Sequence, residues 1–333
     1  MRLEVAKKIA EEMTSINFRL IEPVLGGGNS RIFRLDHGTG SCALKFFRTD
    51  VNNARDRFDA ETSALNIFAE NGMKCVPKLV AQDKENNCTL MEWINGETVT
   101  DFSLKDIDAL SDFVKTVHNI FKQNNSNHIR FATDACLNGN EIVAQINQRL
   151  EYLKPACDIN PELQEFLNED FIPTFKKITA WSKEEYLING MVFDQDISQE
   201  QLTLSLVDIG FHNCLRTEDQ LYFLDFEFFG RDDPVKLIAD TLQHPASKLG
   251  KKQNDYLENK LQKIFNADYQ FKDRLKCLFF LFGLKWCMIM LNPFLPDYKL
   301  INIKDKNIKI SRFKEVKQKL DQIKSTKKVN YRI

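Results

Sequence analysis

The sequence lacks several features that mark well-known classes of protein. It has no C-x-x-C pair, and none of its eight cysteines has a histidine partner at a spacing typical of zinc sites. It has no excess of one charge, because 46 Lys and Arg residues balance 47 Asp and Glu residues. A dedicated nucleic-acid binder normally carries a basic excess, so we expect no nucleic-acid partner. Internal repeats and low-complexity segments are also missing, and 43% of the 333 residues are hydrophobic, as in an ordinary globular protein.

Signals for export or membrane insertion are equally scarce. Residues 1–8 carry no apolar run of the kind that a signal peptide needs. The most apolar stretch, residues 277–291, is interrupted by Lys285 and is too short to span a membrane. The scattered cysteines are typical of reduced, mostly buried thiols. We therefore expect a cytoplasmic protein with no integral membrane segment and a buried helix over residues 277–291.

The character of the chain changes near residue 95. Before it, short β-prone runs at residues 30–35, 41–47 and 87–94 surround one helix at residues 52–71. After it, the hydrophobic periodicity predicts long helices at roughly residues 103–122, 141–155, 161–178 and within 234–291. A β-rich segment at residues 202–229 lies between them. The prediction is an α+β fold with a small β-rich lobe, residues 1–95, and a larger helical lobe, residues 96–333. The Lys-rich end of the chain is typical of a solvated helix face, and less often of an interaction tail.

Two charged residues of the first lobe lie on otherwise apolar faces. Lys45 sits in the apolar strand around residues 41–47, and Glu61 shares a helix face with Phe58 and Leu65. Burying either charge without a partner is costly, so we predict a Lys45–Glu61 ion pair that directs the lysine toward a phosphate. The alternative is that each side chain reaches solvent independently.

Acidic and amide side chains gather in the β-rich island. If residues 214–216 and 221–224 pair as a hairpin, Asn213 enters it and Asp225 leaves it, so the two side chains converge. Asp208 lies on the loop just before. Oxygen ligands of this kind suit Mg²⁺, which takes its other ligands from water and substrate phosphates. The same residue types also serve commonly as turn and capping residues.

Taken in order, these segments resemble the aminoglycoside phosphotransferase (choline kinase-like) family, which has a protein kinase-like fold. The matching pieces are a Gly-rich loop at residues 25–33, the Lys45 strand, the Glu61 helix, a hinge at residues 91–97, and Asp208 to Asn213 followed by Asp225-Phe226-Glu227. Residues 230–240 further resemble the family's G-x-x-D-P-x-x-D-L stretch, in which Asp233 would cap the helix that Pro234 opens. The resemblance covers roughly residues 20–245 of the chain.

The resemblance implies an ATP- and Mg²⁺-dependent kinase with a two-lobe fold. Residues 1–95 would be the nucleotide-binding lobe, and residues 96–333 would hold the catalytic loop and the acceptor site. Asp208 would be the catalytic base, Asn213 and Asp225 would bind the metal, and Glu227 would add a carboxylate near it. The implied nucleotide-binding residues are Gly26, Gly27, Gly28, Asn29, Ala43, Lys45, Glu61, Glu92, Trp93 and Ile94.

The catalytic loop departs from the family pattern. The usual form is H-G-D-x-H-x-x-N, whereas residues 206–213 read L-V-D-I-G-F-H-N, so both family histidines are replaced. The loop resembles a bacterial branch of the family whose members mostly have no assigned substrate. We interpret His212 as a packing or loop residue, because Asp208 already occupies the position of the base.

The implied reaction is phosphorylation of a hydroxyl on a small molecule. We expect a sugar or polyol rather than an aminoglycoside, because the tail from Lys304 holds eleven Lys or Arg residues against three Asp or Glu residues and suits a polycation poorly. A pseudokinase-like nucleotide-binding scaffold is one alternative, suggested by the altered loop. A protein kinase is the other, although no A-P-E-type segment follows residues 225–227. The sequence leaves the oligomeric state open.

Overall fold

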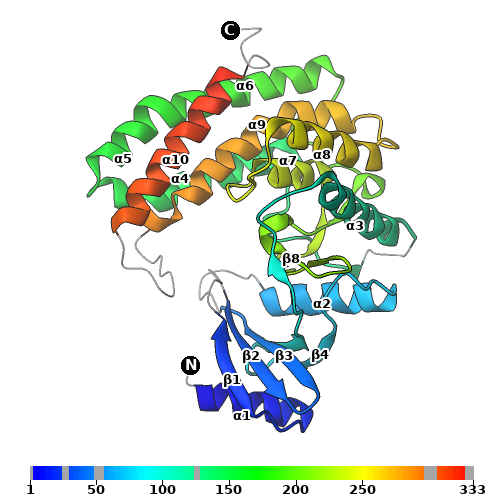
Figure 1. The fold of residues 1–333 in the computed structure, drawn as a ribbon. Coiled ribbons are helices and arrows are strands. Elements are labelled where there is room, and N and C mark those ends of the chain that lie inside the picture. Colours follow the sequence, from blue (N-terminus) through cyan, green and yellow to red (C-terminus); the bar gives the residue numbers. More distant parts are fainter. Residues whose placement is uncertain (1–2, 25–29, 49–55, 124–127, 296–305, 327–333) are drawn as a thin grey trace. The chain divides into compact units, whose positions relative to one another are not determined.

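The computed structural model describes residues 3–24, 30–48, 56–123, 128–295 and 306–326 (Figure 1). Contacts divide the chain into two compact units, each assembled from separate stretches. Unit 1 contains residues 1–110, 119–133 and 206–230, and unit 2 contains residues 111–118, 134–205 and 231–333. The helix α3 (Leu104–Gln123) contributes to both. The predicted α+β fold class is confirmed, with a sheet in the N-terminal part and helices in the C-terminal part; the lobe boundary after residue 95 stays a prediction.

A five-stranded antiparallel sheet forms the centre of unit 1. Its strands lie in the order β1-β2-β3-β5-β4, with bounds Leu20–Val24 (β1), Arg31–His37 (β2), Gly40–Phe46 (β3), Leu79–Asp83 (β4) and Cys88–Glu92 (β5). The predicted hairpin between β2 and β3 is present, and it pairs from Arg31↔Phe46 to His37↔Gly40. Because side chains alternate along a strand, Leu44 and Leu90 face one side of the sheet while Lys45 faces the other.

One helix of unit 1 was not predicted from the sequence. The helix α1 (Leu3–Thr14) packs its buried Ala6, Ile9 and Ala10 against the apolar face of the sheet. These residues follow the i, i+3, i+4 spacing of an amphipathic helix, which is the signal that could have found it. The predicted helix at residues 52–71 is α2 (Arg57–Glu70), and residues 52–55 lie outside the described part of the chain.

A second, smaller sheet of unit 1 follows the loop at residues 206–213. Its strands lie in the order β6-β8-β9, with bounds Glu97–Thr98 (β6), Cys214–Arg216 (β8) and Leu221–Phe223 (β9). The β8–β9 hairpin is the one predicted, and a short 3₁₀ turn (Phe211–Asn213) leads into it. The guanidinium of Arg216 donates to the Asp106 carboxylate at 2.8 Å.

Unit 2 is built around the apolar helix α9 (Phe271–Met290), which contacts α4, α6, α7 and α10. The helices and strands of this unit are α4 (Gly139–Cys157), α5 (Pro161–Glu165), a π-helical turn (Phe166–Phe171), α6 (Ile172–Ile188), β7 (Thr203–Ser205), β10 (Gly230–Asp232), α7 (Pro234–Gln243), α8 (Lys251–Ile264) and α10 (Lys306–Ser325). The β10 strand begins on the last residue of unit 1.

The prediction of a buried helix over residues 277–291 is confirmed by α9. Among the described residues it is the one helix long and apolar enough to cross a membrane, but two thirds of its apolar window is buried inside the protein. Lys285, which interrupts the apolar run, is only 3% exposed and donates to the side-chain oxygen of Gln145. Such burial is typical of a core helix rather than of a membrane span.

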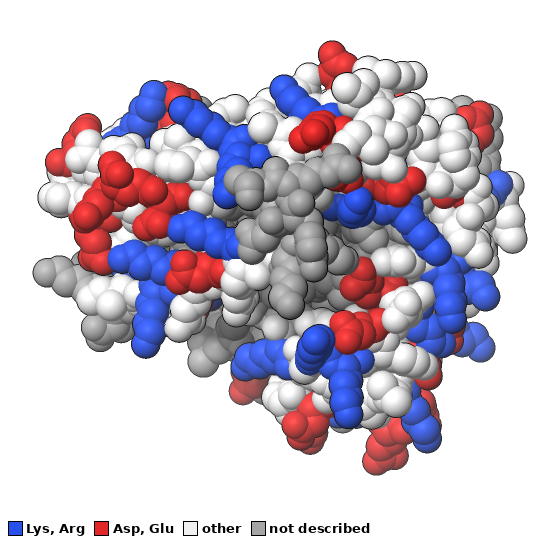
Figure 2. Space-filling model, turned by 90° about the horizontal axis from the view of Figure 1, so that it is seen from above, with Lys and Arg blue, Asp and Glu red and all other residues white. Residues whose placement is uncertain are grey.

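Two other sequence predictions for unit 2 hold. The Asp233 side chain accepts from the Val235 N–H at 2.8 Å and thereby caps α7, which Pro234 opens. The buried Arg274 donates to the same carboxylate. The Lys-rich tail forms α10, and Val316 and Leu320 on its apolar face are buried, so the lysines lie on a helix that is docked rather than free. Figure 2 shows acidic and basic side chains interspersed over the viewed face of the molecule.

The cysteines should react little with thiol reagents in the folded protein. All eight are free, and only Cys75 and Cys157 are partly exposed. Burial raises the pKa of Cys88, Cys136 and Cys287 to about 12, so at pH 8 their thiolate fraction is on the order of 10⁻⁴. We expect Ellman's reagent at pH 8 to label Cys75 and Cys157 within minutes and all eight thiols in guanidinium chloride. Rapid labelling of four or more thiols in the native protein would contradict this burial.

Candidate active site

Lys45 is the centre of a charged cluster within unit 1. It is 3% exposed, and its Nζ donates to Glu61 Oε2 at 2.5 Å and to Asp225 Oδ1 at 2.7 Å. Glu227 Oε2 lies 3.9 Å from the same nitrogen. The predicted Lys45–Glu61 ion pair is therefore present, and the structure adds two carboxylates that the sequence had assigned to metal binding.

The cluster brings three carboxyl groups together with two cationic side chains. Burial raises the pKa of Glu61 to about 7 and also raises the pKa of Glu227. Burial alone would lower the pKa of Lys45, but the carboxylates of Asp225, Glu61 and Glu227 outweigh it and raise that pKa above its usual value. With Arg57 lying 3.8 Å from Glu227, two cations face three carboxylates.

Asn213 and Asp225 meet at the open end of the β8–β9 hairpin. The strands pair from Arg216↔Leu221 to Cys214↔Phe223, and the Leu224 N–H then donates to the Asn213 carbonyl at 2.9 Å. The side-chain nitrogen of Asn213 donates to the Asp208 carbonyl at 2.9 Å, which leaves the amide oxygen Oδ1 for a ligand. Asp225 has a φ of 67°, so the chain turns sharply directly after the hairpin.

The donor set around Asp225 fits a divalent cation such as Mg²⁺. Glu227 is 1% exposed, and among the described residues its Oε1 atom accepts no hydrogen bond. A buried carboxylate oxygen in this state is unusual, because buried polar atoms are nearly always satisfied. Arg57 Nη1 lies 3.8 Å from Glu227 Oε1, beyond hydrogen-bond distance. Glu227, Asp225 and Asn213 each offer oxygen donors, which suit a hard cation.

The Gly-rich segment connects to this cluster through one residue that the sequence analysis missed. The predicted nucleotide-binding residues Gly26, Gly27, Gly28 and Asn29 lie outside the described residues. The next residue, Ser30, is buried, and its hydroxyl donates to Glu227 Oε2 at 3.0 Å. The position of Ser30 directly after the glycines was the available signal, but its partner lies 197 residues away.

The predicted hinge follows the end of β5. Ala43 lies on the same strand face as Lys45, and it pairs with Met91 across the β3–β5 ladder. The Glu92 N–H donates to the Lys78 carbonyl at 2.9 Å, whereas the Trp93 N–H reaches the Ser41 carbonyl only at 3.4 Å. The backbone N–H of Glu92 is thus engaged in the sheet.

Comparison with known proteins decides the family. The sequence profile of the phosphotransferase enzyme family (APH) matches residues 20–269, three quarters of the chain. The chain belongs to this family. No curated protein matches the sequence.

Solved structures show that this phosphotransferase shares its fold with small-molecule kinases. A choline kinase from Cryptosporidium parvum Iowa II is 14% identical, with 97% of this chain and 96% of that chain covered and a TM-score of 0.62. A spectinomycin phosphotransferase in complex with ADP and spectinomycin is 12% identical, with 98% and 99% covered and a TM-score of 0.61. A choline kinase from Streptococcus pneumoniae is 13% identical, with 96% and 98% covered and a TM-score of 0.60. At these identities the likeness establishes the protein kinase-like two-lobe fold.

The loop at residues 206–213 is strained at a position where the family pattern has glycine. Val207 has a φ of 54°, a left-handed conformation that is rare for a β-branched residue. The turn is closed by the Asp208 N–H, which donates to the Leu206 carbonyl at 2.7 Å. Val207 therefore adopts a backbone conformation that glycine would adopt at little cost and that is unfavourable for valine.

Replacing this valine by glycine should stabilise the protein. Strain of this kind costs about 1–3 kcal/mol, and the greater freedom of glycine in the unfolded chain removes about 0.4–1 kcal/mol of the gain. We expect Val207→Gly to raise the free energy of unfolding by about 1 kcal/mol in urea titrations. Val207→Ala is the matched control, because alanine keeps the left-handed penalty; it should give no gain. Destabilisation by Val207→Gly would show that valine packing outweighs the strain.

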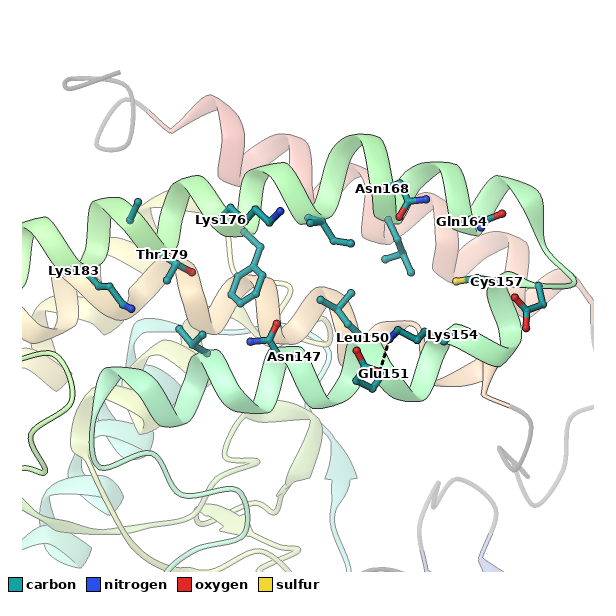
Figure 3. Close-up of a pocket in the computed structure, with 16 residues that line it drawn as sticks. Asn147, Leu150, Glu151, Lys154, Cys157, Gln164, Asn168, Lys176, Thr179 and Lys183 are labelled. Carbon is teal, nitrogen blue, oxygen red and sulfur yellow. Dashed lines mark ion pairs between the residues drawn. The ribbon is translucent and has the colours of Figure 1, made fainter.

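Unit 2 carries a separate groove of about 890 Å³ between α4 and the α5–α6 helices (Figure 3). Leu150, Leu167 and Phe175 give it apolar walls, and three lysines line it: Lys154, Lys176 and Lys183. Lys154 pairs with Glu151 at 2.5 Å. Within the described part of the chain, the buried hydroxyl of Thr179 makes no hydrogen bond. Glu151 and Asp158 also line the groove, so its charged side chains are of both signs.

Proposed function

We propose that this chain transfers the γ-phosphoryl group of ATP to a hydroxyl of a small molecule. The single observation that supports it best is the position of Lys45, which contacts both Glu61 and Asp225 in a buried cluster. A buried lysine held by carboxylates in this way is the arrangement that protein kinase-like enzymes use on nucleotide phosphates. The ADP bound in the similar spectinomycin phosphotransferase adds support for ATP as the donor.

In the proposed reaction each residue has one task. Lys45, held by Glu61, neutralises charge on the nucleotide phosphates, and the glycine segment at residues 26–29 covers them. Ala43 and residues 92–94 contact the adenine. Asn213 and Asp225 hold Mg²⁺, which supplies charge neutralisation when it is bound. Asp208 orients the acceptor hydroxyl and receives its proton.

The bonds and charges of this step balance. The acceptor oxygen forms a bond to the γ-phosphorus, and the bond from that phosphorus to the β–γ bridging oxygen breaks. The electron pair stays on ADP, and the acceptor proton passes to the Asp208 carboxylate. Catalysis of this kind depends on positioning and charge stabilisation, which is consistent with the charged side chains that dominate the cluster.

The acceptor proposed here is a sugar or polyol rather than an aminoglycoside. The Lys-rich tail and the departure of the loop at residues 206–213 from the family pattern support this choice. A cytoplasmic location fits the proposal, because reduced thiols persist in that compartment. The scaffold alternative is less well supported, because a protein that only binds nucleotide needs no base at Asp208.

Transfer of radiolabel from γ-³²P-ATP to pooled sugars and polyols tests the proposal. We expect Mg²⁺-dependent labelling of at least one acceptor, with ADP released in equal amount, and none with Asp208→Asn. Tight ATP binding without transfer to any acceptor would favour the scaffold instead. Labelling of proteins rather than of small molecules would favour a protein kinase, and resistance to kanamycin-type drugs on expression would contradict the acceptor class.

The metal requirement gives a further prediction. Because Asn213, Asp225 and Glu227 offer only oxygen ligands, Mg²⁺ or Mn²⁺ should support ATP binding. We expect EDTA to abolish transfer and Mg²⁺ to restore it, and elemental analysis of the purified protein to find no stoichiometric zinc. One zinc ion per chain would contradict the assignment.

A further inference from the structure

His212 contacts the carboxylate that the proposed function makes the base. Its Nε2 lies 3.1 Å from Asp208 Oδ1, and both side chains are partly exposed. The 3₁₀ turn Phe211–Asn213 carries the histidine back over the start of the loop. A carboxylate only accepts hydrogen bonds, so the imidazole donates its Nε2–H to Oδ1.

The loop makes room for this ring at Gly210. A Cβ atom at Gly210 would lie 2.8 Å from both Cε1 and Nδ1 of His212, closer than side chains tolerate. The φ of Gly210 is 172°, an extended conformation that any residue adopts, so the backbone does not require glycine there. The histidine ring is what excludes a side chain from position 210.

The loop departs from the family pattern at both of these residues. The pattern H-G-D-x-H-x-x-N has histidine two residues after the aspartate, where this chain has Gly210, whereas this chain has histidine four residues after it. In the conformation seen here, the His212 ring fills the space that a side chain at residue 210 would need.

We propose that His212 is the positioning residue for Asp208. Its Nε2–H holds the Oδ1 atom and so fixes the orientation of the carboxylate that receives the acceptor proton. This inference rests on the proposed function, in which Asp208 receives the acceptor proton. It replaces the interpretation of His212 as a loop residue without a role in the reaction.

Removing the donor should slow transfer and leave nucleotide binding intact. A carboxylate that rotates freely is misplaced for much of the time, and misplacement by about 1 Å can cost about 10² in rate. We expect His212→Ala to lower kcat about 10- to 100-fold with little change in the KM for ATP. His212→Gln places an amide N–H at a similar reach and should recover part of the loss, which a purely structural role would not require.

Substitution of Gly210 provides a second, independent test. Gly210→Ala should displace the His212 ring, lower kcat and lower the melting temperature. In the His212→Ala background the same substitution should change neither, because the obstructing ring is gone. A matched surface control is Glu218→Ala in the β8–β9 turn, which should have no effect on kcat.

The outcomes separate this inference from the proposed function. Full kcat in His212→Ala, equal activity of the Ala and Gln variants, or additive effects of Gly210→Ala and His212→Ala would overturn the positioning role alone. A wild-type protein that binds ATP and transfers phosphate to no acceptor would overturn the proposed function, and the role of His212 with it. The melting temperatures of Gly210→Ala, His212→Ala and the double variant test the packing of Gly210 against His212 in either case.

Discussion

Asp208→Asn is expected to abolish most phosphate transfer while leaving MgATP binding nearly unchanged. Asparagine keeps the size of the side chain and can still accept the hydrogen bond from His212, but it cannot take the acceptor proton. Loss of a general base typically costs about 10² or more in rate. Nucleotide and metal binding depend on Lys45, Asn213 and Asp225, so the dissociation constant for MgATP should stay within about twofold.

The control for this result is Asp225→Asn, measured by calorimetry and by transfer assay beside Asp208→Asn. Asp225 contacts Lys45 at 2.7 Å and is the proposed metal ligand, so its replacement should weaken Mg²⁺ and nucleotide binding together. If Asp208 only capped a turn, asparagine would cap equally well and the rate would be preserved. Equal loss of MgATP binding in the two variants would also show that the roles are wrongly assigned.

Lys45→Ala should both abolish activity and destabilise the fold. Lys45 is the buried partner of Glu61, and the nearby Glu227 carboxylate is also buried, so its removal leaves negative charge in the interior without compensation. Breaking a buried ion pair from one side costs about 3–5 kcal/mol. We expect a loss of about that size in the free energy of unfolding, measured in urea, and no nucleotide-dependent activity.

Two variants make this stability effect specific. Lys45→Ala/Glu61→Gln removes one of the stranded charges and should recover part of the lost stability, but no activity. Lys84→Ala breaks the exposed pair between Lys84 and Asp59 of helix α2 and should change neither property measurably, because surface pairs contribute little. Unchanged stability in Lys45→Ala would mean that solvent or a conformational change compensates the carboxylates.

Local patterns predicted much of the fold and part of the site. The β2–β3 and β8–β9 hairpins were predictable because alternating runs flank polar turns, and turn chemistry acts over a few residues. The Lys45–Glu61 pair was predictable because each charge interrupts an apolar face, so each implies a partner.

Contacts between distant segments were not predictable. Ser30 and Glu227 each have an ordinary sequence context, and only the fold brings them within 3.0 Å. The relation between Gly210 and His212 depends on the direction of one ring, which no spacing rule contains. The strained Val207 is a departure from local preference, and a propensity argument cannot anticipate such a departure.

The discontinuous make-up of unit 1 has a consequence for how the chain acquires its structure. Residues 1–110 contain the five-stranded sheet, whereas β8, β9 and Asp225 belong to the same unit but follow about a hundred residues later in the sequence. Phe226 packs against Phe68 with ring centroids 5.1 Å apart, and the Phe223 N–H donates to the Cys75 carbonyl at 2.8 Å. Contacts of such long range form late, because closing long loops is entropically slow. During synthesis, Lys45 and Glu61 therefore cannot contact Asp225 and Glu227 until residues up to about 230 have left the ribosome.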